Sequence, residues 1–300
     1  MIVPRTVPAA DAVAHHYDEL DPFYRAVWGE HVHHGLWTRG DESVEEATEA
    51  LIRVVAGKAQ IQPGDRVADV GCGYGGTARW LATHRGARVT GLTLSEAQAA
   101  EAARQRVPEG VESPEILVRD WLQNGLPDAS FDAVVAIESS THMPDRPRVF
   151  SEMARVLKPG GRLVACIWAT SENPRPWEVK HLLEPICREG RLHGMGSLGE
   201  NRAWAEGAGL VVDELDDLSR SVRKTWAVVA KRVASGVVRD RAYRRFLLDA
   251  RRRERVFALT VARLWLGYRT GALRYGLLVA HKPEAPAGAG GTPAAVDSDR

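Results

Sequence analysis

The chain has 300 residues, of which 44% are apolar and 26% are charged, and its formal net charge is +1. These values are ordinary for a soluble globular protein of one large domain or two small ones. No apolar run reaches the roughly 18–20 residues of a membrane span, no secretory signal pattern opens the chain, and the three cysteines are widely spaced. We therefore expect a cytoplasmic protein without a disulfide framework.

The first sixty residues carry the first helical pattern. Residues 11–60 are predicted to be helical, with a turn near Arg39–Asp41. Ser43 can cap a helix that runs to residue 58, and Glu46, three residues on, completes a capping box. The break at Pro63-Gly64-Asp65 then separates this N-terminal segment from the rest of the chain.

Short apolar strands then alternate with helical patterns, which indicates a parallel sheet with helices on both faces. Two further strands are expected near residues 211 (VVDEL) and 274 (RYGLLVAHK). The expected strands before them are Arg66–Val70, Arg88–Leu92, Ile116–Arg119, Phe131–Ile137 and Arg162–Trp168, and the helices between them are Thr77–His84, Glu96–Val107 and Pro147–Leu157.

A basic, helical region precedes the last expected strand. From Ser219 to Pro283 the chain has 17 Lys or Arg residues against 3 Asp or Glu residues. The region is either a helix with a solvated basic face, or a contact for a membrane surface or an anionic substrate. Nucleic acid is not expected as a partner, because no recognisable nucleic-acid module is present. The apolar positions at helical spacing are Tyr243, Phe246, Leu247 and Ala250, and the basic positions between them are Arg241, Arg244, Arg245 and Arg251–Arg253.

A glycine loop follows the first expected strand. RVADV runs into GCGYGGTARWL, where Gly71, Gly73 and Gly76 satisfy the pattern G-x-G-x-x-G. Glycines let the backbone turn tightly and let a ligand approach without a Cβ in the way. The pattern alone fits NAD, FAD or S-adenosylmethionine (SAM). A dinucleotide site would have Asp or Glu at the end of the second strand, where this chain has Thr93 and Gln98 instead.

Five stretches together resemble a class I SAM-dependent methyltransferase: Asp69–Gly76, Gly91–Gln98, Asp120–Trp121, Ile137–Asp145 and Leu157–Gly161. GLTLSEAQ and YDELDPFYRAVWG are similar to the branch of tocopherol methyltransferases and cyclopropane-fatty-acid synthases. The resemblance implies a Rossmann-like, seven-stranded, mostly parallel sheet with helices on both faces. The resemblance also implies a domain organisation. An N-terminal helical lid (1–60) precedes a methyltransferase domain (61–283) with a basic helical insertion at about 219–272, and a disordered tail (284–300) follows.

The resemblance also implies a set of SAM-binding residues. Gly71 and Gly73 would contact the amino-acid end of the cofactor, Thr93, Leu94 and Gln98 its ribose, and Trp121 its adenine. Plain core packing is the alternative for Trp121, and Cys72 is expected only to fill the tight loop. The full set of expected cofactor contacts is His33, Asp69, Gly71, Gly73, Thr93, Leu94, Gln98, Asp120, Trp121 and Ile137.

The stretch WGEHVHHGLW, from Trp28 to Trp37, holds three histidines and a glutamate. His31 would share one face of a strand with His33, or one face of a helix with His34, so the spacing permits a metal site. No other ligand-rich cluster is apparent, and SAM-dependent methyl transfer needs no metal. We therefore expect no metal site and favour a lid over the cofactor, with His33 near the cofactor carboxylate; a packing or solvated segment is the alternative.

Residues after the fourth and fifth strands are the candidates for chemistry. Glu138 is expected to contact the acceptor, and His142 to act as a base, because an imidazole titrates near neutral pH. Trp168, Glu172 and Trp177 would face the acceptor, and Glu172 could take the proton from a carbocation if the acceptor is an olefin. A structural hydrogen bond for His142 and an exposed loop position for Glu172 are the alternatives.

The predicted activity is SAM-dependent methylation of a small lipophilic acceptor, such as a quinone, phenolic, alkaloid or isoprenoid compound. Transfer to oxygen, nitrogen or carbon is not distinguished. One alternative acceptor is a prenyl diphosphate, which arginines and Mg²⁺ would hold. The other alternative is a SAM-binding scaffold that transfers nothing. The sequence does not predict an oligomeric state.

Overall fold

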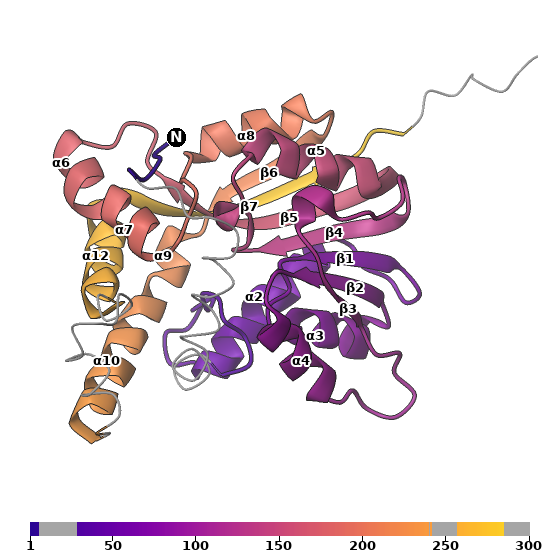
Figure 1. The fold of residues 1–300 in the computed structure, drawn as a ribbon, viewed down its shortest axis with the longest axis horizontal. Coiled ribbons are helices and arrows are strands. Elements are labelled where there is room, and N and C mark those ends of the chain that lie inside the picture. Colours follow the sequence, from indigo (N-terminus) through magenta and orange to yellow (C-terminus); the bar gives the residue numbers. More distant parts are fainter. Residues whose placement is uncertain (6–28, 240, 242–256, 285–300) are drawn as a thin grey trace, which may run out of the picture.

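The computed structural model describes residues 1–5, 29–239, 241 and 257–284. A seven-stranded sheet crosses its centre in the order β3-β2-β1-β4-β5-β7-β6 (Figure 1). The first five strands pair in parallel, and β7 pairs antiparallel with both β5 and β6. The predicted fold class is confirmed. The strands are β1 (Arg66–Val70), β2 (Arg88–Thr93), β3 (Glu115–Val118), β4 (Phe131–Ile137), β5 (Leu157–Thr170), β6 (Val211–Asp217) and β7 (Leu273–His281).

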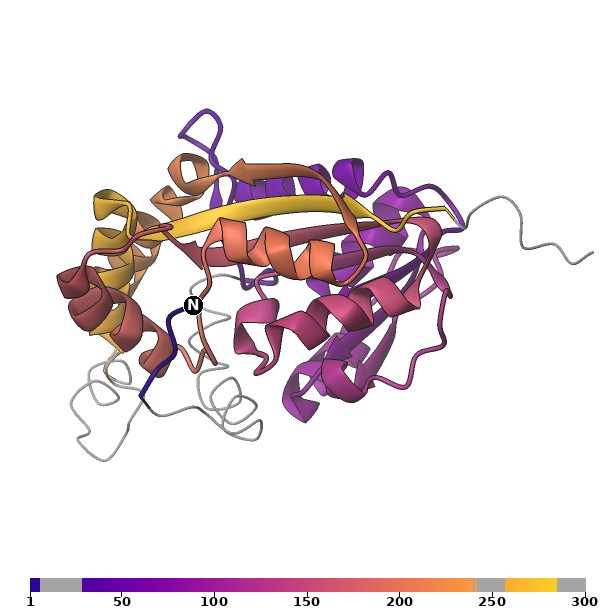
Figure 2. The same ribbon diagram turned by 90° about the horizontal axis from the view of Figure 1, so that it is seen from above.

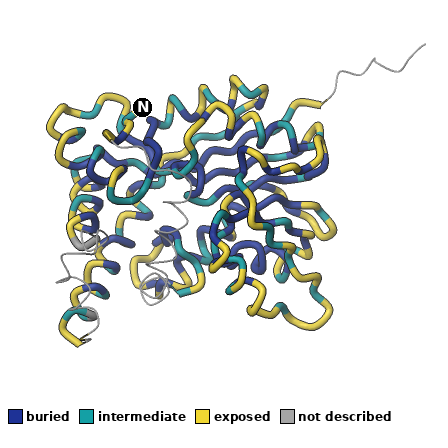
Figure 3. The backbone as a smooth tube through the Cα atoms, in the orientation of Figure 1, coloured by how far each residue is buried: buried dark blue, intermediate teal, exposed yellow. Residues whose placement is uncertain are grey.

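Helices cover both faces of the sheet, as the view from above shows (Figure 2). Successive strand residues point to opposite faces. Val67 of β1 therefore joins one apolar cluster with Leu51 of α2, while Ala68 joins another with Phe150 of α5. In Figure 3, the central strands of the sheet are coloured mostly as buried. The main helices of these layers are α2 (Val44–Lys58), α3 (Gly76–Arg85), α4 (Glu96–Arg104), α5 (Arg146–Val156) and α8 (Leu198–Gly207).

The N-terminal segment departs from the helical prediction before residue 43. The capping box of α2 is present: Ser43 Oγ accepts from the Glu46 N–H at 3.0 Å, and the Glu46 carboxylate accepts from the Ser43 N–H at 2.7 Å. The turn predicted near Arg39–Asp41 is confirmed, whereas residues 29–38 are not helical, so the helical prediction is wrong there. The carboxylate of Glu42 accepts the N–H groups of residues 38, 39 and 40 at 2.7–2.8 Å, and Gly40 has φ +92°. These bonds fold the chain into a turn, whereas residues 11–28 of the prediction lie outside the described residues.

Helices precede β7 where the sequence places a helical insertion. They are α9 (Ser219–Val222), α10 (Lys224–Arg239) and α12 (Phe257–Thr270), and α10 extends away from the sheet (Figure 1). The predicted basic stripe over residues 243–253 and the tail from residue 285 lie outside the described residues. Within the described ranges, none of the helices is long and apolar enough to cross a bilayer. The division into domains stays a prediction.

Candidate active site

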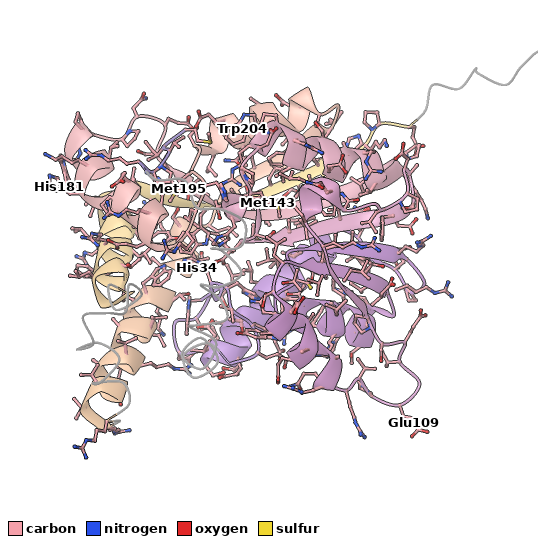
Figure 4. All side chains as sticks on the ribbon, in the orientation of Figure 1. His34, Glu109, Met143, His181, Met195 and Trp204 are labelled. Carbon is pink, nitrogen blue, oxygen red and sulfur yellow. The ribbon has the colours of Figure 1, made fainter. Side chains whose placement is uncertain are left out.

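A cavity of about 220 Å³ lies at the carboxyl ends of β1, β2 and β4, the edge where open α/β sheets bind ligands. One end of this pocket is formed by the glycine loop after β1, by residues 93–98 and by residues 119–121, and is called here the cofactor end. The opposite end is called here the acceptor end. Its described lining is His34, Glu138, His142, Met143, Trp168, Ile186, Gly190, Leu192, Trp226, Thr260 and Leu264 (His34 and Met143 are labelled in Figure 4).

The glycine loop owes its sequence to two different constraints. Gly71 has φ +73°, and a Cβ there would lie 2.3 Å from the Cβ of Ser139, so a side chain is excluded by packing as well as by backbone conformation. Gly73 has φ +54°, but a Cβ there would meet nothing nearer than the side-chain amide of Gln98 at 3.9 Å. The space in front of Gly73 is therefore open to a ligand.

Asp69, on β1, presents a buried carboxyl group to the cofactor end. The side chain is 2% exposed, and its Oδ2 atom has no hydrogen-bond partner. Burial raises its pKa to about 7, because desolvation disfavours the charged form. An unpaired buried carboxyl is costly unless a donor or a cation reaches it. A ligand that carries an ammonium group would suit this position.

The rest of the cofactor end is preorganised by short side-chain bonds. Thr93 Oγ1 donates to Gln98 Oε1 at 2.8 Å, which leaves the amide N–H group of Gln98 directed at the open side of Gly73. Asp120 accepts from the Leu122 N–H at 2.9 Å and so caps the short turn Trp121–Gln123. Trp121 is 2% exposed and donates its indole N–H to Val149 O at 3.2 Å. Trp121 thus packs in the core and also borders the pocket.

All ten residues that the sequence predicts as cofactor contacts line the pocket. Their individual roles stay predictions.

The segment around His31 covers the glycine loop. The Glu30 carboxylate accepts from Arg79 Nε at 3.0 Å and from Arg79 Nη2 at 2.5 Å, which clamps the segment to α3. A Cβ at Gly76 would lie 2.7 Å from His31 Nδ1, so the two segments are in close contact. His33 is buried and donates from Nδ1 to His34 O at 2.8 Å, while its Nε2 has no partner. Across the described parts of the chain, no group of three or more His, Cys, Asp or Glu side chains is arranged to hold a metal.

Glu138 is the centre of a buried hydrogen-bond network at the acceptor end. Its Oε1 accepts from the His34 N–H at 2.7 Å, from His34 Nδ1 at 2.9 Å and from the Tyr275 hydroxyl at 2.7 Å. Its Oε2 accepts from Trp168 Nε1 at 2.7 Å. Burial works against ionisation, but the contacts with His34, through its ring and its backbone N–H, outweigh burial and hold the pKa of Glu138 well below its usual range.

His34 connects this carboxylate to the C-terminal helices. It is 1% exposed, and its Nε2 accepts from Trp226 Nε1 at 2.7 Å. An indole N–H can only donate, so the hydrogen bonds assign the ring proton of His34 to Nδ1, facing Glu138. The Tyr268 hydroxyl lies 3.0 Å from the same Nε2. No local signal in the sequence distinguishes His34 from His31 and His33, because the partners of His34 are far away in the chain.

Of the five residues predicted for catalysis and acceptor binding, three line the pocket and two lie outside it. Glu138, His142 and Trp168 line the pocket. Glu172 is exposed and accepts from the Gly199 N–H at 3.0 Å, and Trp177 is 40% exposed beside the guanidinium of a neighbouring arginine. Neither of these two is among the residues that line the pocket, so the structure does not bring them to the acceptor.

The imidazole of His142 lies near a backbone carbonyl group. Its Nδ1 lies 3.4 Å from Arg191 O. Asp145, the nearest acid in sequence, accepts from the Arg148 N–H at 3.0 Å and caps α5. Asp145 therefore serves as the N-cap of α5.

Comparison with known proteins identifies the family of this fold and pocket. Residues 5–241 match the family described as mycolic acid cyclopropane synthetase. The chain is similar to 27-O-demethylrifamycin SV methyltransferase of Amycolatopsis mediterranei (strain S699), at 33% identity over 281 residues that cover 93% of this chain and 100% of the relative. It is also 31% identical to the probable tocopherol O-methyltransferase, chloroplastic, of Oryza sativa subsp. japonica, over 91% of this chain and 78% of the relative.

The fold is that of a solved member of the same family. The structure of mycolic acid cyclopropane synthase CmaA1 complexed with SAH and CTAB superposes with a TM-score of 0.77 at 21% identity, over 92% of this chain and 99% of the other. SAH is S-adenosylhomocysteine, the demethylated product of SAM. The chain thus belongs to the mycolic acid cyclopropane synthetase family and is a class I SAM-dependent methyltransferase.

Proposed function

We propose that this enzyme methylates a small lipophilic acceptor that binds between Glu138 and the apolar wall of the acceptor end. One observation carries the proposal: a single pocket joins the glycine loop to a chamber lined by Met143, Trp168, Ile186 and Leu192. The relatives whose names specify 27-O-demethylrifamycin SV and tocopherol support an acceptor of this kind.

The cofactor end has the groups that would hold SAM. Asp69 would bind the ammonium group of its amino-acid part, and Gly73 would leave room for it. Because Nδ1 of His33 donates to His34 O, the unpaired Nε2 of the neutral ring can only accept, and it would accept from the same ammonium group. Thr93 and Gln98 would bind the ribose, with Trp121 against the adenine. SAM supplies a methyl group on a sulfonium: the lone pair of the acceptor bonds to the methyl carbon, and the electrons of the broken C–S bond remain on sulfur.

The acceptor end would align the acceptor and exclude water, which strengthens the electrostatic interactions inside the pocket. When the acceptor is a hydroxyl or an amine, its proton must also leave. His142 lines this end, and a neutral imidazole can take a proton near pH 7. We therefore retain His142 as the proton acceptor in this proposal.

The prenyl diphosphate alternative has less support. A diphosphate would need cations, usually Lys, Arg or Mg²⁺. In the described lining, Arg119 borders the cofactor end, whereas the acceptor end holds no Lys or Arg and contains the ionised Glu138.

A peripheral membrane contact is also part of the proposal, carried by the outer face of α12. Leu259, Trp265 and Leu266 are 58%, 43% and 37% exposed, and the guanidinium of Arg269 lies 4.8 Å from the Trp265 ring centroid. An apolar stripe with flanking cations suits an anionic lipid surface. The inner face of the same helix places Leu264 at the acceptor end, so a lipophilic acceptor would enter close to the membrane. A cytoplasmic location stays a prediction.

Mass spectrometry tests the proposed activity. The protein is incubated with methyl-labelled SAM and pooled aromatic, quinone and prenyl diphosphate acceptors, with and without EDTA. We expect a labelled aromatic or quinone product whose yield does not depend on EDTA. A labelled product from the diphosphates alone, lost with EDTA, would establish the alternative acceptor. Tight SAM binding without transfer to any acceptor would favour a scaffold.

A further inference from the structure

The carboxylate of Glu138 keeps its negative charge although it is enclosed. Its four hydrogen-bond donors come from three residues, His34, Trp168 and Tyr275. With the His34 proton on Nδ1 and its Nε2 accepting from Trp226, all four donors belong to neutral groups. In the described part of the chain, no Lys or Arg forms an ion pair with Glu138, and the His34 ring, which lies at ion-pair distance (2.9 Å), would carry a charge only if it were protonated. With the ring neutral, the carboxylate is stabilised by hydrogen bonds but its charge is not neutralised.

The groups packed around this carboxylate add no cation from any other element. Cys166 on β5 and Tyr275 on β7 are buried, and burial raises the pKa of each. Tyr268 on α12 is buried too, and its pKa is also raised by burial. On the N-terminal segment, burial lowers the pKa of His33, which favours the neutral imidazole. Among the residues that the structure describes, the charge of Glu138 therefore faces the pocket without a resident counter-ion.

The position of Glu138 joins the two ends of the pocket. It follows the last residue of β4, and the next residue, Ser139, packs so closely on Gly71 that a Cβ at Gly71 would lie 2.3 Å from the Ser139 Cβ. Glu138 has φ +61°, a left-handed conformation that is unfavourable for a non-glycine residue. The four hydrogen bonds hold it in this conformation, at the junction between the glycine loop and the acceptor end.

We propose that Glu138 is the fixed counter-charge for the sulfonium of SAM, and that His34 is the positioning residue that holds the carboxylate there. This inference rests on the proposed function. A charge in a low-dielectric pocket acts far more strongly on an opposite charge than the same pair does in water. SAM carries the sulfonium charge and SAH does not. Glu138 thus favours the methyl donor over its demethylated product, and loss of the methyl group weakens retention of the product.

Titration calorimetry with SAM and SAH tests this inference without any acceptor. Glu138→Gln keeps the shape of the side chain and removes the charge. We expect it to weaken SAM binding roughly tenfold, as an ion pair in a partly shielded site implies, and to change SAH binding by less than about twofold. Equal weakening of both ligands would make Glu138 merely structural, and unchanged SAM binding would also overturn the inference.

Two substitutions of His34 separate positioning from folding. The amide nitrogen of Asn can occupy the place of Nδ1, so His34→Asn keeps a donor for Glu138, whereas His34→Leu removes it. We expect His34→Leu to lose the preference for SAM over SAH and His34→Asn to retain most of it. If both variants keep the preference equally, His34 does not position the carboxylate.

Glu42→Gln is the matched control. Glu42 is also a buried carboxylate, and it accepts four hydrogen bonds from residues 38–40, away from the pocket lining. Its substitution should leave the ratio of SAM to SAH affinity unchanged.

Binding measurements on the wild-type protein test the inference without any substitution that could prevent folding. Sinefungin carries an amine, positively charged at neutral pH, in place of the methyl sulfonium. The wild-type protein should bind sinefungin and SAM more tightly than SAH. Binding of all three with equal affinity would overturn the counter-charge while leaving the methyltransferase proposal intact. Failure of the wild type to bind either SAM or SAH would instead refute the proposed function.

Discussion

The two ends of the pocket are assembled in different ways. The cofactor end depends on stretches that are continuous in the chain: the glycine loop follows β1, and Thr93 bonds to Gln98 five residues later. The acceptor end depends on partners that are far apart, since His34 bonds to Glu138 across 104 residues and to Trp226 across 192. The cofactor end is thus built mainly from local sequence, and the acceptor end from tertiary packing.

The largest expected effect is at the cofactor end. Gly71→Val should abolish measurable SAM binding, because a β-branched side chain cannot adopt φ +73° without strain and its Cβ would collide with Ser139. Calorimetry measures the affinity, and circular dichroism checks the fold. Gly57→Ala is the control, since a Cβ there would meet nothing within 4 Å. SAM affinity within about tenfold of wild type in Gly71→Val would contradict this account of the loop.

At the acceptor end, substitution should affect the rate and not SAM binding. His142→Ala should lower kcat by about 10²–10⁴-fold, the usual range for loss of a general base, while SAM affinity stays nearly unchanged. His181→Ala is the control, because His181 is exposed and lies at the periphery of the molecule (Figure 4). A parallel loss of rate and SAM affinity would make His142 structural. An unchanged rate would assign the proton to another group.

The pH dependence of SAM binding should come from Asp69. Because burial raises its pKa to about 7 in the free protein, the ammonium group of SAM must displace a proton below that pH. Affinity should therefore rise roughly tenfold per pH unit between about pH 5.5 and 7, and then level off. Asp69→Asn should bind SAM more weakly and without this slope. A flat profile in the wild type would separate Asp69 from the ammonium group.

The raised pKa of Asp69 also predicts how folding stability changes with pH. The folded protein keeps a proton on Asp69 up to about pH 7, whereas the unfolded chain releases it near pH 4. Without ligand, the contribution of Asp69 to folding stability is complete below about pH 4 and is lost as the pH rises to about 7. Denaturant unfolding of wild type and Asp69→Asn across this range should show the difference, and parallel stability curves would contradict it.

The smallest expected effect concerns the outer face of α12. Combined alanine substitutions at Leu259, Trp265 and Leu266 should weaken binding to anionic lipid vesicles several-fold and leave SAM affinity unchanged. The remaining electrostatic part of the binding should decrease with salt, because screening acts over about 8–10 Å at physiological ionic strength. Co-sedimentation with vesicles measures both effects. Equal binding by the wild type and the triple variant would remove this face from the proposal.

The difference between the two ends of the pocket also determines how much of the fold and of the site can be predicted from the sequence. Alternating strands and helices fix the sheet, and β1 and β4 begin and end where the pattern indicates, because buried parallel strands have a strong local signal. The glycine loop has an equally local signature. The helical prediction is wrong for residues 29–38, because the backbone N–H groups of His34, Leu36 and Trp37 donate to Glu138, Ala47 O and Ser221 O instead of to a helix. The turn near Arg39–Asp41 is predicted correctly, and the carboxylate of Glu42 closes it.

The acceptor end could be predicted only in part. Glu138 and His142 follow a strand at the ligand-binding edge, which is a general property of such sheets. Nothing local distinguishes His34 as the buried histidine, because its environment comes from Trp226, Tyr268 and Tyr275 on later elements. Glu172 was placed by proximity to β5, but the loop carries it to the Gly199 N–H. The path of a loop depends on tertiary contacts, which the periodicity of apolar residues in the sequence does not reveal.

A crystal structure of the wild-type protein with SAH tests the division of the pocket most directly. We predict that the amino-acid part of SAH lies at Gly73 and Asp69, its adenine lies against Trp121, and its sulfur points toward Glu138 and the acceptor end. SAH bound in any other orientation, with its sulfur directed away from Glu138, would contradict the account.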